Sequence, residues 1–495
     1  MAGDPGVPRT LAPTQWHNFS PRLGLAYSPS SSSGILGRLF GGPGRTSIRL
    51  GAGLYYTSVE DLSQFLEVGD PPYGLYYGSA APPLLEAPYL ERFSGQSVGQ
   101  RFPFPFPPTN VSASNPDATF PWAQVEPLSY DFSFDHRNKL PYSEHYELSI
   151  QRQVGSNTVI TASYVGNQGH RLVTSVEANP TNQAACLAVH NSTAPGDATC
   201  DSFSETPPFT VTVQNGQSIG VSTPWQTSSG PVASVRPLGP LFDTNPFVST
   251  IANSRYNSLQ FSASHNSGSL SLLAGYTYSK CMDNASGLQD STNPFDPRLS
   301  IALCNFDVTH NFVLSYNWVL PFDRLGAGGW AKKLLGGWSL SGVTNFATGL
   351  PVTLIESDDA SLIGANAIPL DVPNYTPGAG ALFVNRNPRS RQPYFNNLKG
   401  PGDAGAVFSF ENLGQLGNSR RRFFHGPGLN NFNMALLKST KITESKQIEL
   451  RFEAFNLFNH AQFMNPGGDI TADNFGVVQS ARDPRIMQIG AKFIF

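Results

Sequence analysis

The chain has 495 residues, enough for one large barrel or for two or three ordinary globular domains. Only 14% of the residues are charged, against roughly 25% in an average soluble domain, while 12% are aromatic. The net charge of −3 and the shortness of the longest basic run, Arg420 to Arg422, exclude a nucleic-acid-binding surface. The sequence also has no run close to the ~18 consecutive apolar residues that a membrane-spanning helix needs.

Alternation of apolar and polar residues is the main pattern along the chain. Between 269 and 279, for example, Leu270, Leu272 and Ala274 share one face, because successive side chains of a strand point to opposite sides. The same two-residue period predicts strands at 22–27, 48–56, 146–151, 158–164, 258–263, 269–279, 311–320, 338–346, 432–437, 447–454 and 487–495. The segment 475–480 is a candidate for a twelfth, short strand.

Aromatic residues stand at the ends of several predicted strands, as at Tyr276 and Tyr278 and at Phe493 and Phe495. This placement is typical of the two interfacial belts of a membrane barrel, whereas a soluble sandwich favours Val, Ile and Leu on its buried face. The fold class that we predict is therefore all-β, an antiparallel transmembrane β-barrel.

Short and long connections between the predicted strands alternate. The short ones are 155–157, 266–268 and 443–445, and the long ones are 57–141, 173–253, 281–310 and 348–428. Short turns on one rim and long loops on the outer rim are the pattern of outer-membrane barrels. If the last strand runs toward the periplasm, eleven strands place these long loops outside the cell. Residues 1–20 would then enter from an outer loop, so we expect the chain to start in mid-barrel; a twelfth strand would reverse this parity.

The four cysteines form two local pairs, Cys186 with Cys200 and Cys281 with Cys304. An even number at close spacing predicts two disulfides in an oxidising compartment. The alternative is four unrelated thiols. Neither pair has the Cys-x-x-Cys spacing or the neighbouring histidines of a zinc site.

Charged residues alternate with apolar ones near the C-terminus, so Glu449, Arg451 and Glu453 are predicted to face the lumen of a barrel. Lys492 faces the same side on the next strand and is a candidate partner for one of the glutamates. One hypothesis is a substrate path or a docking surface for a plug. The interpretation that we favour is a solvated inner wall with cross-strand ion pairs.

The loop 281–310 is rich in hard oxygen ligands. Asp283, Asp290, Asp296 and Asp307 are candidates for calcium binding, although no EF-hand spacing is present and a solvated loop is the favoured interpretation. We therefore predict no metal and no cofactor. No HExxH, GxSxG or Walker pattern occurs, so an enzyme is not predicted; a Ser-His-Asp triad, whose members need not be adjacent, stays open.

Several stretches in a fixed order resemble the barrel of an Oar-like TonB-dependent transporter. They are PRLGLAYSP (21–29), TSIRLGAGLYY (46–56), YELSIQRQVGSNTVITASYVGNQGHRL (146–172), SRYNSLQFSASH (254–265), YTYSKCMDNASG (276–287), FDVTHNFVLSYNWVLPF (306–322), LGGWSLSGVTNFATGLPVT (335–353), GPGLNNFNMALLKSTKI (426–442), ELRFEAFNLFNHAQF (449–463) and DPRIMQIGAKFIF (483–495). The terminal Phe495, behind Phe493, resembles the C-terminal signal that the barrel assembly machinery reads.

The resemblance implies a barrel of about 22 strands in the outer membrane of a Gram-negative bacterium, in contact with outer-membrane lipid. It also implies an N-terminal plug domain and energy supplied by the TonB complex. Residues 1–495 would be the C-terminal portion of such a barrel, with about 11–12 of its strands and with no plug, TonB box or signal peptide. The implied function is transport of an unidentified ligand. The alternatives are a surface binding or adhesion platform and, as a third hypothesis, an outer-membrane barrel enzyme.

Overall fold

The computed structural model describes residues 14–58, 133–187, 245–363, 371–379, 392–398 and 405–495, apart from 32, 185, 289, 291–292 and 326–328. It also describes residue 382 and a few short pieces between 208 and 238.

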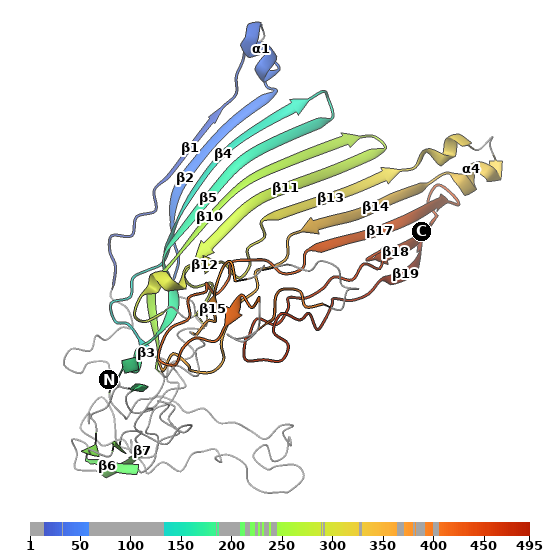
Figure 1. The fold of residues 1–495 in the computed structure, drawn as a ribbon. Coiled ribbons are helices and arrows are strands. Elements are labelled where there is room, and N and C mark those ends of the chain that lie inside the picture. Colours follow the sequence, from blue (N-terminus) through green and yellow to red (C-terminus); the bar gives the residue numbers. More distant parts are fainter. Residues whose placement is uncertain are drawn as a thin grey trace, which may run out of the picture.

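One antiparallel sheet organises these residues (Figure 1). Eleven of its strands follow one another in chain order, each hydrogen-bonded to the next. They are β1 (Arg22–Tyr27), β2 (Thr46–Tyr56), β4 (Tyr142–Val154), β5 (Thr158–Glu177), β10 (Pro246–Ser267), β11 (Leu270–Asp283), β13 (His310–Val319), β14 (Trp338–Ala347), β17 (Leu429–Lys441), β18 (Gln447–Phe455) and β19 (Ile486–Ile494). All eleven predicted segments therefore form strands. The candidate twelfth strand was wrong, since within 475–480 only Phe475 makes an isolated bridge.

The other elements are short. They are β3 (Ser133–Phe134) beside β10, β12 (Ala302–Leu303) beside β11, the pairs β6 (Pro208–Thr212) with β7 (Ser218–Ser222), β8 (Gln226–Thr227) with β9 (Gly230–Pro231) and β15 (Asn374–Tyr375) with β16 (Phe408–Ser409), the helices α1 (Gly34–Phe40) and α4 (Gly329–Leu335), and the 3-10 turns η2 (Pro297–Ser300) and η3 (Pro321–Leu325). Among the described residues, no helix has both the length and the hydropathy to cross a membrane.

The register of the sheet keeps each predicted face intact across several strands. Ser271 pairs with Asn317, and Asn317 pairs with Ser341, so one face is polar. On the other face, large apolar side chains such as Leu259 and Phe261 are about half exposed, at 45% and 46%. Large apolar side chains left exposed over many strands make the kind of band that membrane barrels present to lipid.

The two rims of the sheet differ as the loop lengths predict. The end that carries α1, α4 and the C-terminus has the short connections, and the opposite end has the long ones (Figure 1). We call these ends the short-turn rim and the long-loop rim. The strands β5 and β10 reach furthest toward the long-loop rim, with 20 and 22 residues. Both continue beyond the segments in which apolar and polar side chains alternate.

The described sheet is an open one, with β1 and β19 at its two edges. Every residue of both strands is exposed. Because neighbouring strands are antiparallel and the two edge strands are first and eleventh along the path, β1 and β19 run in the same direction. The total of 22 strands stays a prediction.

The long connections beyond β14 and β18 fold on a hydrophobic core of their own. Its fully buried side chains include Phe395, Phe408 and Phe475, whose rings meet edge to face at 5.1 to 5.8 Å. Val352, Leu354 and Ile470 complete the contacts between the two connections. We call this the loop core. The described parts of these connections are thus packed by side chains of their own.

Candidate functional site

The polar face of the sheet lines a hollow of about 580 Å³. Its lining includes Ser271, Asn317, Ser341, Arg451 and Glu453, which come from β11, β13, β14 and β18. A hollow lined by one face of a continuous sheet requires that face to be concave. We call this concave polar face the inner wall.

The structure brings the charged residues of the inner wall together in a way that differs in part from the prediction. The Arg451 Nη2 lies 3.1 Å from the Glu453 Oε1 two residues along the same strand, and Gln488 Nε2 donates across to Glu453 Oε2. The register places Lys492 opposite Glu449. Among the ion pairs of the described residues, however, the one on this wall runs along β18 rather than across strands. Arg451 is half exposed, so this pair contributes little stability.

Cys281 and Cys304 lie at the long-loop rim. Cys281, at the end of β11, is joined to Cys304 in a disulfide with a Cα–Cα distance of 5.4 Å. The Cys281 amide also donates to Asp307 Oδ1 at 2.6 Å, so the loop 281–310 is closed at its base. Cys186 is disulfide-bonded too, and Cys200 lies outside the described residues.

Phe493 and Phe495 stand at the end of the edge strand β19. Their rings stack with centroids 5.9 Å apart, and the two side chains are 51% and 89% exposed. The terminal aromatic pair is thus accessible at the short-turn rim.

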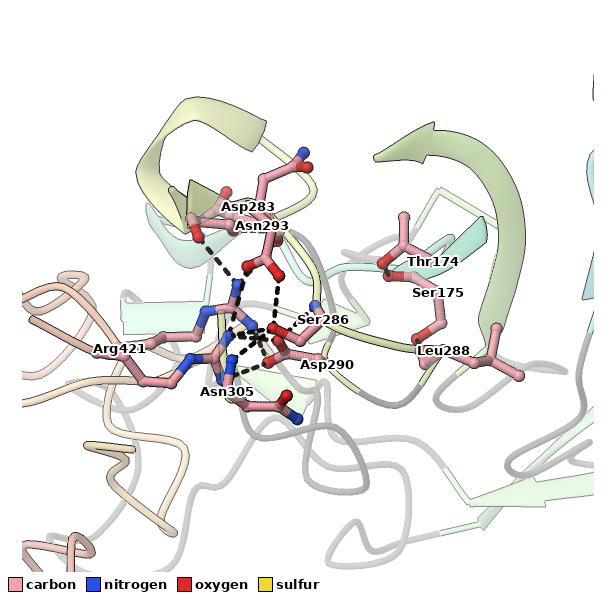
Figure 2. Close-up of polar contacts among 12 residues, drawn as sticks. Thr174, Ser175, Asp283, Ser286, Leu288, Asp290, Asn293, Asn305 and Arg421 are labelled. Atoms are coloured by element: carbon pink, nitrogen blue, oxygen red, sulfur yellow. Dashed lines mark hydrogen bonds and ion pairs between the residues drawn. The ribbon is translucent and has the colours of Figure 1, made fainter. Parts of the chain in front are cut away.

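Two arginines fasten the loop 281–310 to the connection between β14 and β17 (Figure 2). Arg421 Nη2 donates to the carbonyl oxygens of Asn284 and Ser300 at 2.8 and 2.9 Å. Arg422 Nε donates to the Leu303 oxygen at 2.7 Å. Both guanidinium groups are almost fully buried, so their binding partners are groups of the two loops themselves.

The same two guanidinium groups neutralise two carboxylates of the facing loop (Figure 2). Arg422 Nη2 lies 2.6 Å from Asp290 Oδ2 and 3.6 Å from Asp283 Oδ1, and Arg421 Nη1 donates to Asp290 Oδ1. Burial raises the pKa of the Asp290 carboxyl, but the Arg422 hydrogen bond and the charges of both arginines outweigh burial, so the net pKa is lowered. We call these four residues the arginine clasp.

The calcium hypothesis for the loop 281–310 has no support in this arrangement. Asp283 and Asp290 bind arginines, Asp296 pairs with Arg298 at 2.9 Å, and Asp307 pairs with His425 Nε2 at 2.8 Å. Asp283 and Asp290 share Arg422, whereas Asp296 and Asp307 each have another partner. Within the described part of the chain, no three His, Cys, Asp or Glu side chains converge to hold a metal ion. The expectation of a solvated loop was wrong as well for Asp283 and Asp307, which are buried.

A second acidic group lies within the loops, where Glu356 approaches Glu411. Burial, the adjacent Glu411 carboxyl group and the charges of Asp358 and Asp371 raise the pKa of Glu356 to about 10. Burial likewise raises the pKa of Asp371 to about 7. This group was not singled out from the sequence, where its members lie up to 55 positions apart, from 356 to 411.

Comparison with known proteins assigns the family. The family model described as "Outer membrane beta barrel domain" matches residues 1–488. The chain belongs to this outer-membrane β-barrel family. Its members reside in the outer membrane of Gram-negative bacteria, as predicted, and this outer-membrane β-barrel protein has the antiparallel all-β fold that the alternation indicates.

Solved structures with a similar fold are outer-membrane proteins of low sequence identity. The outer membrane transporter YddB from Escherichia coli is 9% identical, with a TM-score of 0.42, covering 97% of this chain and 41% of that one. The siderophore receptor PirA from Acinetobacter baumannii is 9% identical, with a TM-score of 0.38, covering 96% and 41%. The ferric-catecholate import receptor Fiu from E. coli K12 is 8% identical, with a TM-score of 0.35, covering 96% and 34%. The chain thus spans less than half the length of these proteins. No curated protein matches it.

The features of this outer-membrane β-barrel protein that sequence reasoning missed are the loop core and the arginine clasp. Arg420 to Arg422 were considered only as a basic patch. Their role depends on contacts with residues more than 115 positions away, at 283–303, which no local pattern encodes. The one hint was three adjacent positive charges in a connection otherwise rich in Phe, Gly and Pro.

Proposed function

We propose that this chain is the C-terminal portion of a TonB-dependent outer-membrane transporter of the Oar-like type, and that it contributes about half of the barrel wall. The observation that carries the proposal is the open sheet whose two edge strands run in the same direction. Unpaired backbone groups along such edges are costly in lipid, so the edges call for further strands.

The directions of the two edge strands restrict the number of further strands. Closing the sheet with antiparallel pairs alone requires an odd number of additional strands, because β1 and β19 are parallel to each other. Eleven plus an odd number is even, as in bacterial outer-membrane barrels. A barrel of about 22 strands has a lumen wide enough to hold a plug.

The proposed mechanism assigns a task to each part. The loops of the long-loop rim capture a ligand outside the cell, the inner wall guides its passage, and a plug pulled by the TonB complex supplies the free energy. Outer-membrane lipid contacts the apolar face of the sheet. The assembly machinery engages Phe493 and Phe495 at the exposed end of β19. No step requires a catalytic residue or a cofactor.

The experiment that tests the proposal compares bacteria with and without the gene, and with and without TonB. The cells are given a defined mixture of iron chelates, cobalamin, oligosaccharides and peptides, and depletion of each solute is followed by mass spectrometry. We expect one class of solute to be depleted only when both the gene and TonB are present. Depletion that persists without TonB would contradict energised transport.

A binding or adhesion platform is the second candidate, and the loop core supports it as much as it supports transport, because it gives the connections at the long-loop rim a packed interior. In the same experiment, solute bound to cells but never internalised, with or without TonB, would support the platform.

A further inference from the structure

Glu356 and Glu411 are buried without a hydrogen-bond donor. Their side chains are only 1% and 7% exposed, and none of their four carboxylate oxygens has a hydrogen-bond partner. The ion pairs of the described residues lie elsewhere, at the arginine clasp, at β18 and in exposed turns. Two adjacent buried carboxylates without a counter-charge are strongly unfavourable.

The backbone holds the two glutamates in place. The Glu356 amide donates to the Asp371 oxygen at 3.0 Å, and Glu411 follows β16, which pairs with β15 three residues after Asp371. Further along, a Cβ at Gly417 would lie 1.6 Å from the Val372 oxygen, so this segment packs closely against the residues that precede β15. The two carboxylates are therefore brought together by three packed segments of one loop, beside the loop core.

Two chemical solutions exist for such a pair, a shared proton or a bound cation. One shared proton makes a single hydrogen bond and leaves two of the four oxygens without any partner. A cation between the carboxylates attracts all four oxygens and cancels their charge. The contrast with Asp283 and Asp290 points the same way, because those buried carboxylates each have an arginine.

We propose that Glu356 and Glu411 bind a calcium ion that fastens the loop core. Calcium takes oxygen ligands in a flexible geometry and accepts backbone oxygens and water beside carboxylates. It therefore needs no third acidic side chain, and among the described residues no third one converges on the pair. Magnesium requires a stricter octahedron, and zinc prefers nitrogen and sulfur ligands. The site is distinct from the lumen and from the ligand passage proposed above.

Equilibrium dialysis of the full-length gene product in detergent against ⁴⁵Ca²⁺ tests the site directly. We expect one ion per chain, with a dissociation constant of about 10⁻⁴ to 10⁻³ M, as in extracellular calcium modules. Glu356→Gln and Glu411→Gln should each weaken binding at least about tenfold, because each removes one of two carboxylates. Glu444→Gln, in the exposed turn between β17 and β18, is the matched control and should bind like the wild type.

Hydrogen exchange on the wild-type protein locates the ion even if a glutamine variant fails to fold. Calcium should slow amide exchange in 355–363 and 408–415 and leave the sheet unchanged. Absence of stoichiometric binding at 5 mM calcium, or protection confined to other segments, would overturn the proposal and leave a shared proton as the explanation. Neither result depends on whether the protein transports a ligand.

Discussion

The arginine clasp shows how much can depend on a single buried charge. Arg422 is 2% exposed and faces Asp283 and Asp290 together. Replacing it leaves Asp283 buried without its arginine and leaves Asp290 with Arg421 alone, and breaking such a buried pair typically costs about 3–5 kcal/mol. Arg421 Nη1 and Nη2 are already occupied by Asp290 and by the carbonyl oxygens of Asn284 and Ser300.

We therefore expect Arg422→Met to release the loops while the sheet stays folded. The measurement is limited proteolysis of intact cells, with cleavage in 281–310 as the readout. Arg298→Met is the control, since Arg298 also pairs with an aspartate of this loop, Asp296, but is 85% exposed. Equal protease sensitivity of the two variants would contradict a structural role for the clasp.

The clasp also predicts a dependence on pH. Because the net pKa of Asp290 is lowered in the folded protein, its pairing stabilises the loops fully above the unfolded value of about 3.9 and is lost as the pH falls through the lower folded value. Cleavage within 281–310 should thus increase as the pH falls below about 4, where the pairing of Asp290 is lost. Asp290→Asn should abolish that increase; an increase of the same size in this variant would assign it to other groups.

Among the strands, two tyrosines cover glycines on the neighbouring strand. Tyr146 lies opposite Gly166, and Tyr316 lies opposite Gly342. A Cβ at Gly342 would meet the Tyr316 hydroxyl oxygen at 2.6 Å and the Asn433 backbone oxygen at 2.7 Å. The glycine is thus required by the ring that packs across it, a device that fixes strand register.

Gly342→Ala should destabilise the barrel by about 1–3 kcal/mol, as overpacking does. Gly275→Ala is the matched control on β11, because nothing lies within 4 Å of its added Cβ. The difference in stability is measured as the temperature at which the folded band is lost in gel electrophoresis of unboiled samples. Identical transitions for both variants would show that the Tyr316 ring moves aside freely.

The disulfide between Cys281 and Cys304 closes a loop with a sequence separation of 23. By loop entropy, removing it should cost about 3 kcal/mol. We expect Cys281→Ala combined with Cys304→Ala to make the loop 281–310 sensitive to protease without altering the sheet. Unchanged resistance would show that the arginine clasp alone holds this loop.

The sequence predicted the strands well because a two-residue period is a local property. Each of the eleven segments became a strand, and Arg451 and Glu453 lie on the inner wall. Prediction from the sequence failed where a structural feature depends on residues distant in the sequence. The ends of β5 and β10 were missed because alternation lapses there, and the loop core because Phe395, Phe408 and Phe475 carry no periodic signal.

For the molecule as a whole, the two open edges make a prediction about the isolated chain. Residues 1–495 expressed alone should not give a compact, heat-resistant band in unboiled gels, because closure would require a parallel pair between β1 and β19. The full-length gene product should give one. A heat-resistant band from residues 1–495 alone would mean that the sheet closes on itself and would reject the half-barrel proposal.

The loop core has a consequence for how such a protein diversifies. Its eight side chains pack the two outer connections against each other, so exposed residues around them can be exchanged while this core stays unchanged. New recognition properties can then arise by exchanging exposed loop positions alone. A lineage facing toxins or phages at its surface could change its outward appearance repeatedly while the membrane wall is inherited unaltered.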